Sequence, residues 1–371
     1  MAHVVVAPDK FKGSLTARAA AEALARGIGR VRPDLAVHQV PVADGGDGTV
    51  AAALAAGFTP LRTTVRGPTG QPVTATIAVR DGVAVVEAAA ACGLALLPDG
   101  RPAPLTASSY GVGELLLAAV AEGCTTAVLG VGGTASTDGG AGLVQALGGT
   151  VLDTHGGPLP PGGGALVDVA AVHLDTLDPR LAGLEVVLAS DVDNPLLGPA
   201  GAAAVFGPQK GADEAQLRQL EAGLAAWSAL VNPGFADTPG AGAAGGIGFA
   251  ALAVLGATRR AGIGLLLDLI GFADHLPGAA LVITGEGSLD EQSLHGKAPI
   301  GVVEAAGAAG VRSVAVAGRC QLDRQALADA GISAAYVLSD LEPDPALCMA
   351  DADRLLERLA VRVAEDWLVS V

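Results

Sequence analysis

An aspartate and a lysine stand near the two ends of residues 190–211, which read SDVDNPLLGPAGAAAVFGPQKG. Asp191 directly follows an apolar run at residues 184–189 that is typical of a buried strand, and open α/β sheets bind their ligands where strands end. Lys210 lies in a short loop between two glycines. Together these residues could serve a hydroxyl group and a phosphate. The alternative is a polar turn between a strand and a helix.

The lysines of the chain are few, and they share one setting. Of 22 Lys and Arg residues only four are lysines, and these lie beside glycines in the stretches DKFKGS, GPQKG and LHGKAP. They are Lys10, Lys12, Lys210 and Lys297. Lysine supplies a compact charge where the planar fork of arginine does not fit. Because phosphate binding commonly uses a lysine at a glycine loop, we expect these residues to handle an anion; the alternative is chance placement.

Two further polar stretches follow predicted strands. In VADGGDGT, Asp44 and Asp47 could bind Mg²⁺ through oxygen or could cap the helix that follows. In TGEGSLDEQSLHGKAP, the dense polar content at a strand end indicates a functional loop. This loop is not a Walker A motif, because Glu291 and Ala298 stand where that motif needs glycine and Ser or Thr.

Glycine-rich stretches at residues 130–140 and 239–249 leave alternatives open. The first contains a GxGxxA pattern at residues 130–135, and Asp153 lies about twenty residues further on, as in a dinucleotide-binding fingerprint. A helix N-terminus at this place would serve ATP or a carboxylate as readily as NAD, and a tight turn would need the same small residues. The second stretch could be a close-packed helix start or a ligand-facing loop.

Composition narrows the class of protein. The net charge of −16 and the pI of about 4.6 argue against nucleic acid and anionic membranes as partners. No stretch has the ~20 consecutive apolar residues of a membrane span, and the N-terminal apolar run is too short for a signal peptide. Four separated cysteines without a CxxC pair indicate free thiols in a reducing compartment. We therefore expect a cytoplasmic enzyme.

The order of elements predicts an α/β fold. Strands at residues 3–7 and 35–40 flank a helix at residues 16–31, which is typical of a parallel sheet. Residues 63–87 read as short strands with tight turns and predict a mixed sheet. Further on, Asp213 with Gln216 three residues later predicts the start of a helix over residues 213–230, and a closing helix is expected over residues 344–369.

From these elements we predict two α/β domains. A Rossmann-like parallel-sheet domain comes from residues 1–62 and 272–371, and a second α/β domain with a mixed sheet is inserted at residues 63–271.

Six motifs together resemble the bacterial type I glycerate kinase family. They are APDKFKGSLTA, VADGGDGT, VGGTASTDGGAG, SDVDNPLLGPAGAAAVFGPQKGA, PGAGAAGGIGFA and TGEGSLDEQSLHGKAP, and they run in family order over residues 7–299. The resemblance implies two α/β domains, one of them Rossmann-like, and phosphorylation of D-glycerate with ATP and Mg²⁺, generally to 2-phosphoglycerate. We expect the active site in the cleft between the domains, because such a reaction must exclude water.

The candidate site residues follow from these motifs. Asp191 is assigned as the base that accepts the hydroxyl proton, and Lys210 and Lys297 complete the catalytic set. Asp193 and Asp44 are the candidate Mg²⁺ ligands. The candidate substrate- and nucleotide-binding residues are Lys12, Ser14, Asp44, Gly45, Gly132, Gly133, Thr134, Asn194, Gly285, Glu286, Ser288 and Asp290.

Several alternatives stay open at this point. Within the kinase class, the product could be 3-phosphoglycerate, or the substrate another short hydroxy acid. Outside it, the GxGxxA pattern with Asp153 would suit an NAD(P)-dependent oxidoreductase, and a non-catalytic sensor of a hydroxy acid would leave Asp191 unexplained. The expected partner is D-glycerate alone, without nucleic acid or membrane, and the protein is expected to be a monomer or homodimer.

Overall fold

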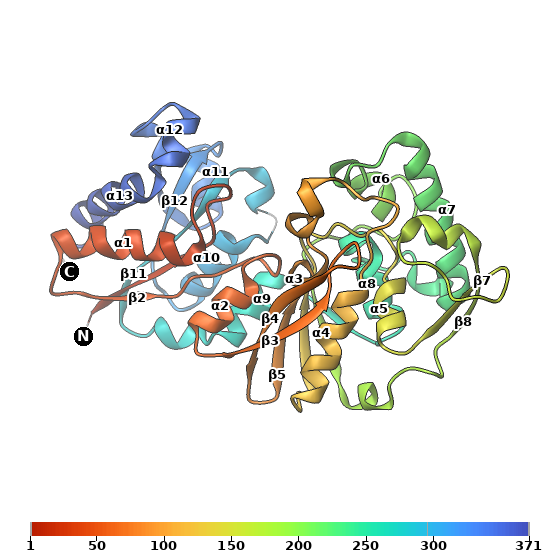
Figure 1. Ribbon diagram of the computed structural model, residues 1–371. Coiled ribbons are helices and arrows are strands. Elements are labelled where there is room, and N and C mark those ends of the chain that lie inside the picture. The colour runs from red at the N-terminus through yellow and green to blue at the C-terminus, as the bar shows by residue number, and fades with distance from the viewer. Residues whose placement is uncertain (1, 295, 370–371) are drawn as a thin grey trace. The chain divides into compact units, whose positions relative to one another are not determined.

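The computed structural model describes residues 2–294 and 296–369, and the chain divides into two compact units (Figure 1). Unit 1 comprises Met1–Asp44, Ala51–Ala56 and Ala261–Val371, and unit 2 comprises Gly45–Val50 and Gly57–Arg260. The boundaries of the structure differ from the predicted ones. The predicted boundaries at residues 62/63 and 271/272 lie after the observed ones, since the long segment of unit 2 begins at Gly57 and ends at Arg260. One reason is helix α9 (Gly262–Leu269), whose Ile263 and Leu266 pack beside Val5 in the core of unit 1.

Unit 1 is built on a parallel sheet with the strand order β13-β12-β11-β1-β2. Its strands are β1 (His3–Pro8), β2 (Ala36–Gln39), β11 (Ala279–Leu289), β12 (Ser313–Cys320) and β13 (Ile332–Val337). All six residues of β1 are buried, as expected for a parallel strand that is covered on both faces.

Helices cover both faces of this sheet. Val4 and Val6 of β1 pack in one cluster with α1 (Ala17–Val31) and α13 (Ala352–Trp367). Val5 lies on the opposite face with α9 and α10 (Ala298–Ala308), because successive side chains of a strand point to opposite faces. Two short helices, α11 (Arg324–Asp329) and α12 (Pro345–Ala350), complete the unit. The predicted Rossmann-like fold class is confirmed.

Two elements of unit 1 differ from the sequence prediction. The closing helix is broken at Asp351 into α12 and α13, and the Asp344 carboxylate caps α12. Strand β11 continues to Leu289, so it includes the start of the stretch TGEGSLDEQSLHGKAP that was predicted to be a loop. The extension depends on glycine, because a Cβ atom at Gly285 would lie 2.5 Å from Cγ2 of Val316 on β12 and would clash with the carbonyl of that residue.

Unit 2 contains a mixed sheet with the strand order β10-β9-β6-β5-β4-β3. The strands are β3 (Thr59–Arg66), β4 (Pro72–Arg80), β5 (Val83–Glu87), β6 (Thr126–Gly130), β9 (Glu185–Ala189) and β10 (Thr258–Arg260). The pairs β3–β4 and β4–β5 are antiparallel, and β5, β6, β9 and β10 run parallel. The predicted mixed sheet is therefore confirmed, and its parallel half gives the unit a common edge of strand carboxyl ends.

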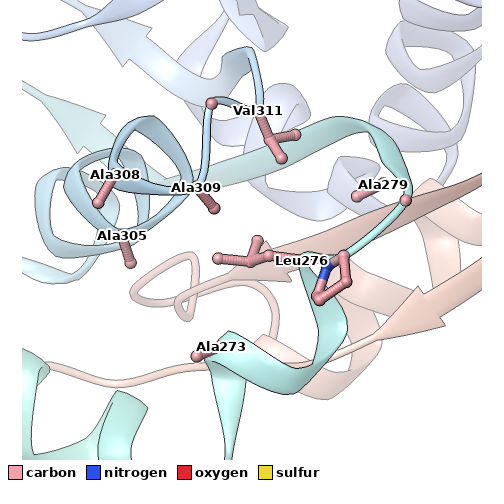
Figure 2. Close-up of a pocket in the computed structure, with 10 residues that line it drawn as sticks. Ala273, Leu276, Ala279, Ala305, Ala308, Ala309 and Val311 are labelled. Atoms are coloured by element: carbon pink, nitrogen blue, oxygen red, sulfur yellow. The ribbon is translucent and has the colours of Figure 1, made fainter.

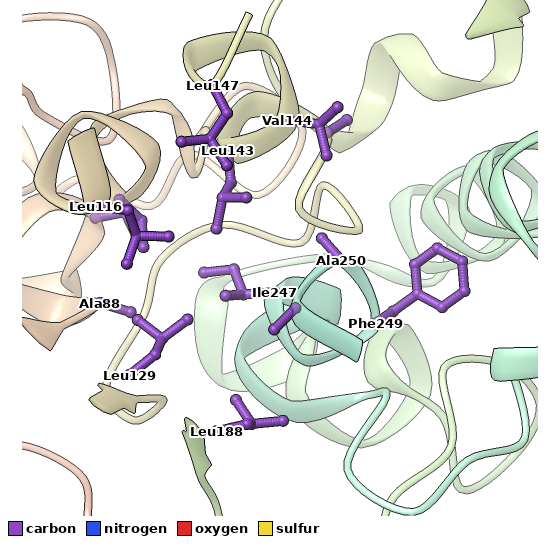
Figure 3. Close-up of a cluster of buried hydrophobic side chains, with 14 of the residues drawn as sticks. Ala88, Leu116, Leu129, Leu143, Val144, Leu147, Leu188, Ile247, Phe249 and Ala250 are labelled. Atoms are coloured by element: carbon purple, nitrogen blue, oxygen red, sulfur yellow. The ribbon is translucent and has the colours of Figure 1, made fainter. Parts of the chain in front are cut away.

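Helices and a small second sheet surround this mixed sheet. Figure 3 shows Leu129 of β6, Leu188 of β9 and Ile247 of a glycine-rich helix in one buried cluster. The helices are α3 (Ala89–Cys92), α4 (Tyr110–Ala121), α5 (Ala141–Ala146), α6 (Ala202–Phe206), α7 (Glu214–Val231) and α8 (Ala243–Ala253), with α2 (Thr49–Ala55) divided between the units. Strands β7 (Thr150–Asp153) and β8 (Val169–His173) form a separate antiparallel pair.

Across residues 2–294 and 296–369, the helices are either too short or too polar to traverse a lipid bilayer.

Candidate active site

The carboxyl ends of β1 and β11 carry the polar residues of unit 1. These strands pair in parallel, with Pro8 opposite Gly285. The N–H group of Asp9 then donates to the Gly285 carbonyl oxygen at 2.8 Å, so that Asp9 and Glu286 follow at the same edge. Open α/β sheets bind ligands at this edge, and the structure therefore places two of the predicted residues, Gly285 and Glu286, where a ligand is expected.

Asp9 is a candidate that the sequence prediction missed. Its side chain is buried, and its Oδ1 accepts a hydrogen bond from the Lys10 N–H group at 2.6 Å. Burial is the main cause that raises the pKa of Asp9 to about 7; the Lys10 charge lowers this pKa, and the carboxylates of Asp44 and Glu286 raise it. The carboxylates of Asp44 and Glu286 therefore lie near enough to Asp9 to act on it electrostatically. The missed signal was the position directly after a strand, as for Asp191.

Glu286 and Lys297 are close enough to interact electrostatically. Burial raises the pKa of Glu286, and the hydrogen bond from Ser293 and the Lys297 charge lower it. Oε1 of Glu286 is buried and has no hydrogen-bond partner among the described residues. Lys297 is the N-cap residue of α10. The two predicted residues therefore form part of one polar cluster in unit 1.

Ser288 and Asp290 have a local structural role in this cluster. The Ser288 hydroxyl donates to Oδ2 of Asp290 at 3.3 Å and accepts from Nε of Arg319 at 3.0 Å. Oδ1 of Asp290 accepts the Ser293 N–H at 3.3 Å. These bonds hold the turn that joins β11 to α10.

Lys12 and Ser14 lie in a small closed loop after β1. The loop is anchored by Phe11, which is buried and whose carbonyl accepts the Ser14 hydroxyl at 3.0 Å. A Cβ atom at Gly287 of β11 would lie 3.2 Å from the Lys12 nitrogen, so the backbone of Lys12 runs past the end of β11. Lys12 is exposed, and its ammonium group is accessible to an anion.

In unit 2, the loop after β6 is organised around Asp138, a second residue that the sequence prediction missed. Asp138 is fully buried. Its carboxylate accepts hydrogen bonds from the Ser109 N–H at 2.8 Å, the Ser109 hydroxyl at 2.9 Å, the Gly140 N–H at 3.2 Å and the Gly142 N–H at 3.3 Å. Burial raises the pKa of Asp138, while these bonds lower it. The carboxylate therefore fixes the start of α5.

Lys210 is buried against the same loop. It is 4% exposed, and its Nζ donates to the Ser136 carbonyl oxygen and lies 3.5 Å from Oγ1 of Thr134. Burial lowers the pKa of Lys210 to about 8, and the neighbouring Cys92 and Asp138 act in the opposite direction. The predicted residues Lys210 and Thr134 are therefore in contact.

The part of this loop that directly follows β6 carries Gly132, which is half-buried, and Gly133, which is exposed. Their N–H groups have no hydrogen-bond partner within residues 2–294 and 296–369. Gly133 has φ of 66°, a conformation that glycine adopts without strain. The chain therefore presents two backbone donors at the carboxyl end of β6, as an anion-binding turn would.

The glycine-rich stretch at residues 239–249 packs closely against this loop. The Gly139 N–H donates to the Gly245 carbonyl oxygen at 3.0 Å. A Cβ atom at Gly246 would lie 2.6 Å from Cα of Gly139, and one at Gly245 would clash with the Ser136 carbonyl. Of the two alternatives for this stretch, the structure supports the close-packed helix start.

Asp191 and its neighbours follow β9 at the same edge of the sheet. Asp191 is half-buried. Oδ1 of Asp193 pairs with Nη2 of Arg259 at 2.6 Å, and Nδ2 of Asn194 donates to the Ala200 carbonyl at 2.8 Å. Since Asp193 already has a cationic partner and its side chain is 79% exposed, it suits a metal site less well than the carboxylates of unit 1.

The ADGGDGT turn, which includes Gly45, is held by a residue that the prediction did not include. Oε1 of Glu87, at the end of β5, accepts the Gly48 N–H at 3.0 Å and the Val50 N–H at 2.6 Å. The Thr49 hydroxyl donates to the Gly46 carbonyl at 2.7 Å. Glu87 thus supplies a carboxylate at the start of α2.

No group of three or more His, Cys, Asp or Glu side chains in the described ranges is arranged as a metal site. A pocket of about 680 Å³ lies in unit 1 at the amino end of β11, and therefore opposite the polar edge. Apolar side chains line it, among them those of Leu276, Ala305 and Val311 (Figure 2). None of the candidate residues contributes to this pocket.

The dinucleotide-binding alternative does not match the fold. Asp153 lies at the end of β7, in the separate antiparallel pair β7–β8, whereas the fingerprint places its acidic residue after the next parallel strand. Oδ1 of Asp153 accepts the His155 N–H at 2.8 Å and the Gly157 N–H at 3.0 Å. It therefore holds a local turn.

Comparison with known proteins decides the family. A model described as the glycerate kinase family matches residues 4–368. The chain belongs to the glycerate kinase family. It is 44% identical over 340 residues to the glycerate kinase of Bacillus subtilis (strain 168), covering 90% of this chain and 89% of the relative. It is also 44% identical over 310 residues to the glycerate 2-kinase of Escherichia coli (strain K12), covering 82% and 81%.

A crystal structure from Salmonella typhimurium LT2, whose protein carries the provisional name glycerate kinase 2, is similar over 98% of both chains, with a TM-score of 0.84 and 37% identity. The resemblance predicted from the six motifs is confirmed, and this glycerate kinase family member is an enzyme of the kinase class. The NAD(P)-dependent oxidoreductase alternative is not favoured.

Proposed function

We propose that the protein transfers a phosphoryl group from ATP to the 2-hydroxyl of D-glycerate and releases 2-phosphoglycerate and ADP. The observation that carries this proposal is the family match over residues 4–368, together with a relative named glycerate 2-kinase at 44% identity. The polar residues at the carboxyl ends of both sheets support it, because phosphoryl transfer depends on positioning and on neutralisation of charge.

Asp191 is the proposed base. It follows β9, at the edge where the loop after β6 presents the Gly132 and Gly133 N–H groups. A carboxylate at this place accepts the proton of the substrate hydroxyl as that oxygen attacks the phosphorus. Asn194 belongs to the same segment, and its amide holds the segment through the Ala200 carbonyl.

Anionic groups of the ligands are assigned to cations and backbone donors within each unit. In unit 1, Lys12 is exposed and Lys297 stands at the start of α10, where a lysine side chain and helical N–H groups can share an anion. In unit 2, the Gly132 and Gly133 N–H groups offer neutral donors. Triphosphate oxygens and the glycerate carboxylate are the anions these groups would bind.

Mg²⁺ is the proposed cofactor, and the residues of unit 1 fit it. Oε1 of Glu286 is buried without a hydrogen-bond partner in the described part of the chain, and Asp44 and Asp9 are close enough to interact with it electrostatically. Mg²⁺ commonly takes only one or two protein carboxylates and completes its shell with phosphate oxygens and water. When bound, it would neutralise phosphate charge; Asp44 and Glu286 are the ligands we propose, ahead of Asp193.

The experiment that tests the proposal is ADP release with MgATP and D-glycerate, with L-glycerate as the control and the ³¹P resonance of the product read in the same sample. Turnover with D-glycerate and the resonance of 2-phosphoglycerate is the expected result. A 3-phosphoglycerate resonance would move the reacting hydroxyl, and turnover only with another short hydroxy acid would change the substrate. No turnover by folded protein would contradict the proposal.

We further propose a cytoplasmic protein that acts as a monomer or homodimer on a small molecule, without nucleic-acid or membrane partners. The net charge of −16 supports the absence of polyanionic partners, and the four free cysteines support a reducing compartment. Light scattering after gel filtration measures the oligomeric state directly.

A further inference from the structure

We propose that Lys210 is a positioning residue, which acts by holding the backbone of the loop at residues 132–139 rather than by contacting a phosphate. This inference rests on the proposed kinase activity and refines the catalytic role that the sequence suggested for this lysine.

The first argument is the environment of the ammonium group. Lys210 is 4% exposed, so it is nearly removed from solvent. Its Nζ donates to the carbonyl oxygen of Ser136 and lies 3.5 Å from the Thr134 hydroxyl, and both acceptors are buried residues of the loop. A cation that reaches phosphate needs an accessible face, whereas this one is surrounded by the loop that it holds.

The second argument is the cost of keeping a lysine there. Burial disfavours the charged amine, and Cys92 and Asp138 are the titratable groups that influence it. The Cys92 thiol has a pKa raised to about 12 by burial, so it stays neutral near pH 7. Because burying a charge is costly unless the charge is hydrogen-bonded, the bonds of Nζ to the Ser136 carbonyl and the Thr134 hydroxyl are what stabilise the lysine in this place.

The third argument is how tightly the loop is constrained around these contacts. The Trp227 indole N–H donates to the Gly139 carbonyl at 3.0 Å, the Asp138 carboxylate fixes the start of α5, and Gly245 packs against Ser136. A Cβ atom at Gly245 would lie 2.9 Å from Nζ of Lys210. The lysine is therefore one of several supports, and it holds the part of the loop nearest to the Gly132 and Gly133 donors.

Trp227 makes the inference testable without any ligand. The chain has two tryptophans, Trp227 and Trp367, and Trp367→Phe leaves Trp227 as the only indole emitter. In that background we expect Lys210→Met to raise acrylamide quenching of Trp227 emission about twofold, because a released loop opens more often. The matched control is Gln209→Met, the same replacement at the exposed neighbour, which should leave quenching unchanged.

The kinetic readout separates positioning from direct contact. A displaced donor loop should lower kcat of Lys210→Met by about 10- to 100-fold. Lys210→Arg should be impaired to a similar degree, since the larger guanidinium does not fit beside Gly245. If Lys210 instead contacted phosphate, Lys210→Arg would retain more activity than Lys210→Met, and quenching in the ligand-free protein would not change; that pair of results overturns the inference.

A milder variant covers the case in which Lys210→Met does not fold. Thr134→Val removes only the hydroxyl acceptor, and it should raise quenching and lower kcat in the same direction. In folded double variants the effects of the two substitutions should be less than additive, because both act on one loop. Additive effects would overturn the inference. If the wild-type protein fails to turn over glycerate, the quenching experiment still decides the role of Lys210.

Discussion

The two polar edges of this molecule are built differently. At the edge of the unit 1 sheet, Asp9 and Glu286 are carboxyl groups whose pKa values are raised mainly by burial, and one oxygen of Glu286 is without a described partner. At the edge of the unit 2 sheet, Asp138 accepts four hydrogen bonds and Lys210 donates to the loop beside it.

We infer from this difference that the two edges have different roles in the proposed reaction. Unit 1 holds charges that a bound cation or anion would satisfy, so its edge suits the binding of the charged parts of the ligands. At the edge of unit 2, the buried Asp138 and Lys210 already have hydrogen-bond partners within the unit, so this edge suits the orientation of a reacting group. Fixed donors of this kind require little reorganisation when the reaction occurs.

The strongest test of these different roles is Asp191→Asn, since Asp191 is the proposed base in unit 2. We expect kcat to fall by about 10²- to 10⁴-fold, because the amide cannot accept the hydroxyl proton. Circular dichroism should remain that of the wild type. Near-normal turnover in a folded variant would show that Asp191 is not the base, and that unit 2 does not supply it from this position.

Asp138→Ala tests whether unit 2 is held by its buried carboxylate. The substitution leaves the Ser109 and Gly140 donors unsatisfied in a buried site, and we expect the free energy of unfolding to fall by about 3–5 kcal/mol. Urea denaturation followed by circular dichroism measures this change. A loss below about 1 kcal/mol would show that the hydrogen bonds of Asp138 contribute little.

Asp9→Asn tests unit 1, where the pKa of a buried carboxyl group is raised mainly by burial. In the wild type the folded state holds the Asp9 proton up to about pH 7, so between about pH 4 and 7 it binds more protons than the unfolded state. Asp9 therefore makes its whole contribution to the free energy of unfolding below about pH 4. This contribution, on the order of 2–3 kcal/mol, is lost as the pH rises through 7. Asp9→Asn should remove this slope in urea titrations at several pH values; an unchanged slope would contradict the assignment.

The smallest expected effect concerns the amino edge of the same sheet, where His38 stacks on His3 at 4.2 Å between ring centres. Burial lowers the pKa of His38, and the neighbouring His3 and His275 lower it further. This contribution to stability is present above about pH 6.5 and is lost as the pH falls, the reverse of the slope for Asp9. His38→Gln should change the stability at pH 5.5 relative to pH 7.5 by a few tenths of a kcal/mol, measured as the difference in urea midpoints; an identical difference in the wild type would exclude this contribution.

Much of the fold could be predicted because it depends on local pattern. The run of valines after His3 predicts a buried strand, and the pair Asp213 and Gln216 predicts a helix start. The structure contains both, with Gln216 and Asp213 forming a reciprocal capping box. The extension of β11 could not be predicted, because it depends on a neighbouring strand that approaches Gly285 and Gly287 from a distant part of the chain.

The candidate site was predicted less completely, for a physical reason. Asp9 and Asp138 read as loop residues in the sequence, and only tertiary packing shows that they are buried. The scarcity of lysine pointed to Lys210, but nothing local indicated that its partner is the Ser136 carbonyl. The roles of the individual residues remain predictions that the variants above can test.

The contact between the two glycine-rich stretches has a consequence for the order of folding. Gly139 meets Gly246 and bonds to Gly245, although more than a hundred residues separate them in the chain. Contacts of such long sequence separation are entropically costly and form late. During synthesis, the loop after β6 therefore lacks its contacts with Gly245 and Gly246 until these residues have left the ribosome. A nascent chain that ends before α8 would have most of the strands of the mixed sheet but not the glycine-rich surface that supports the loop after β6.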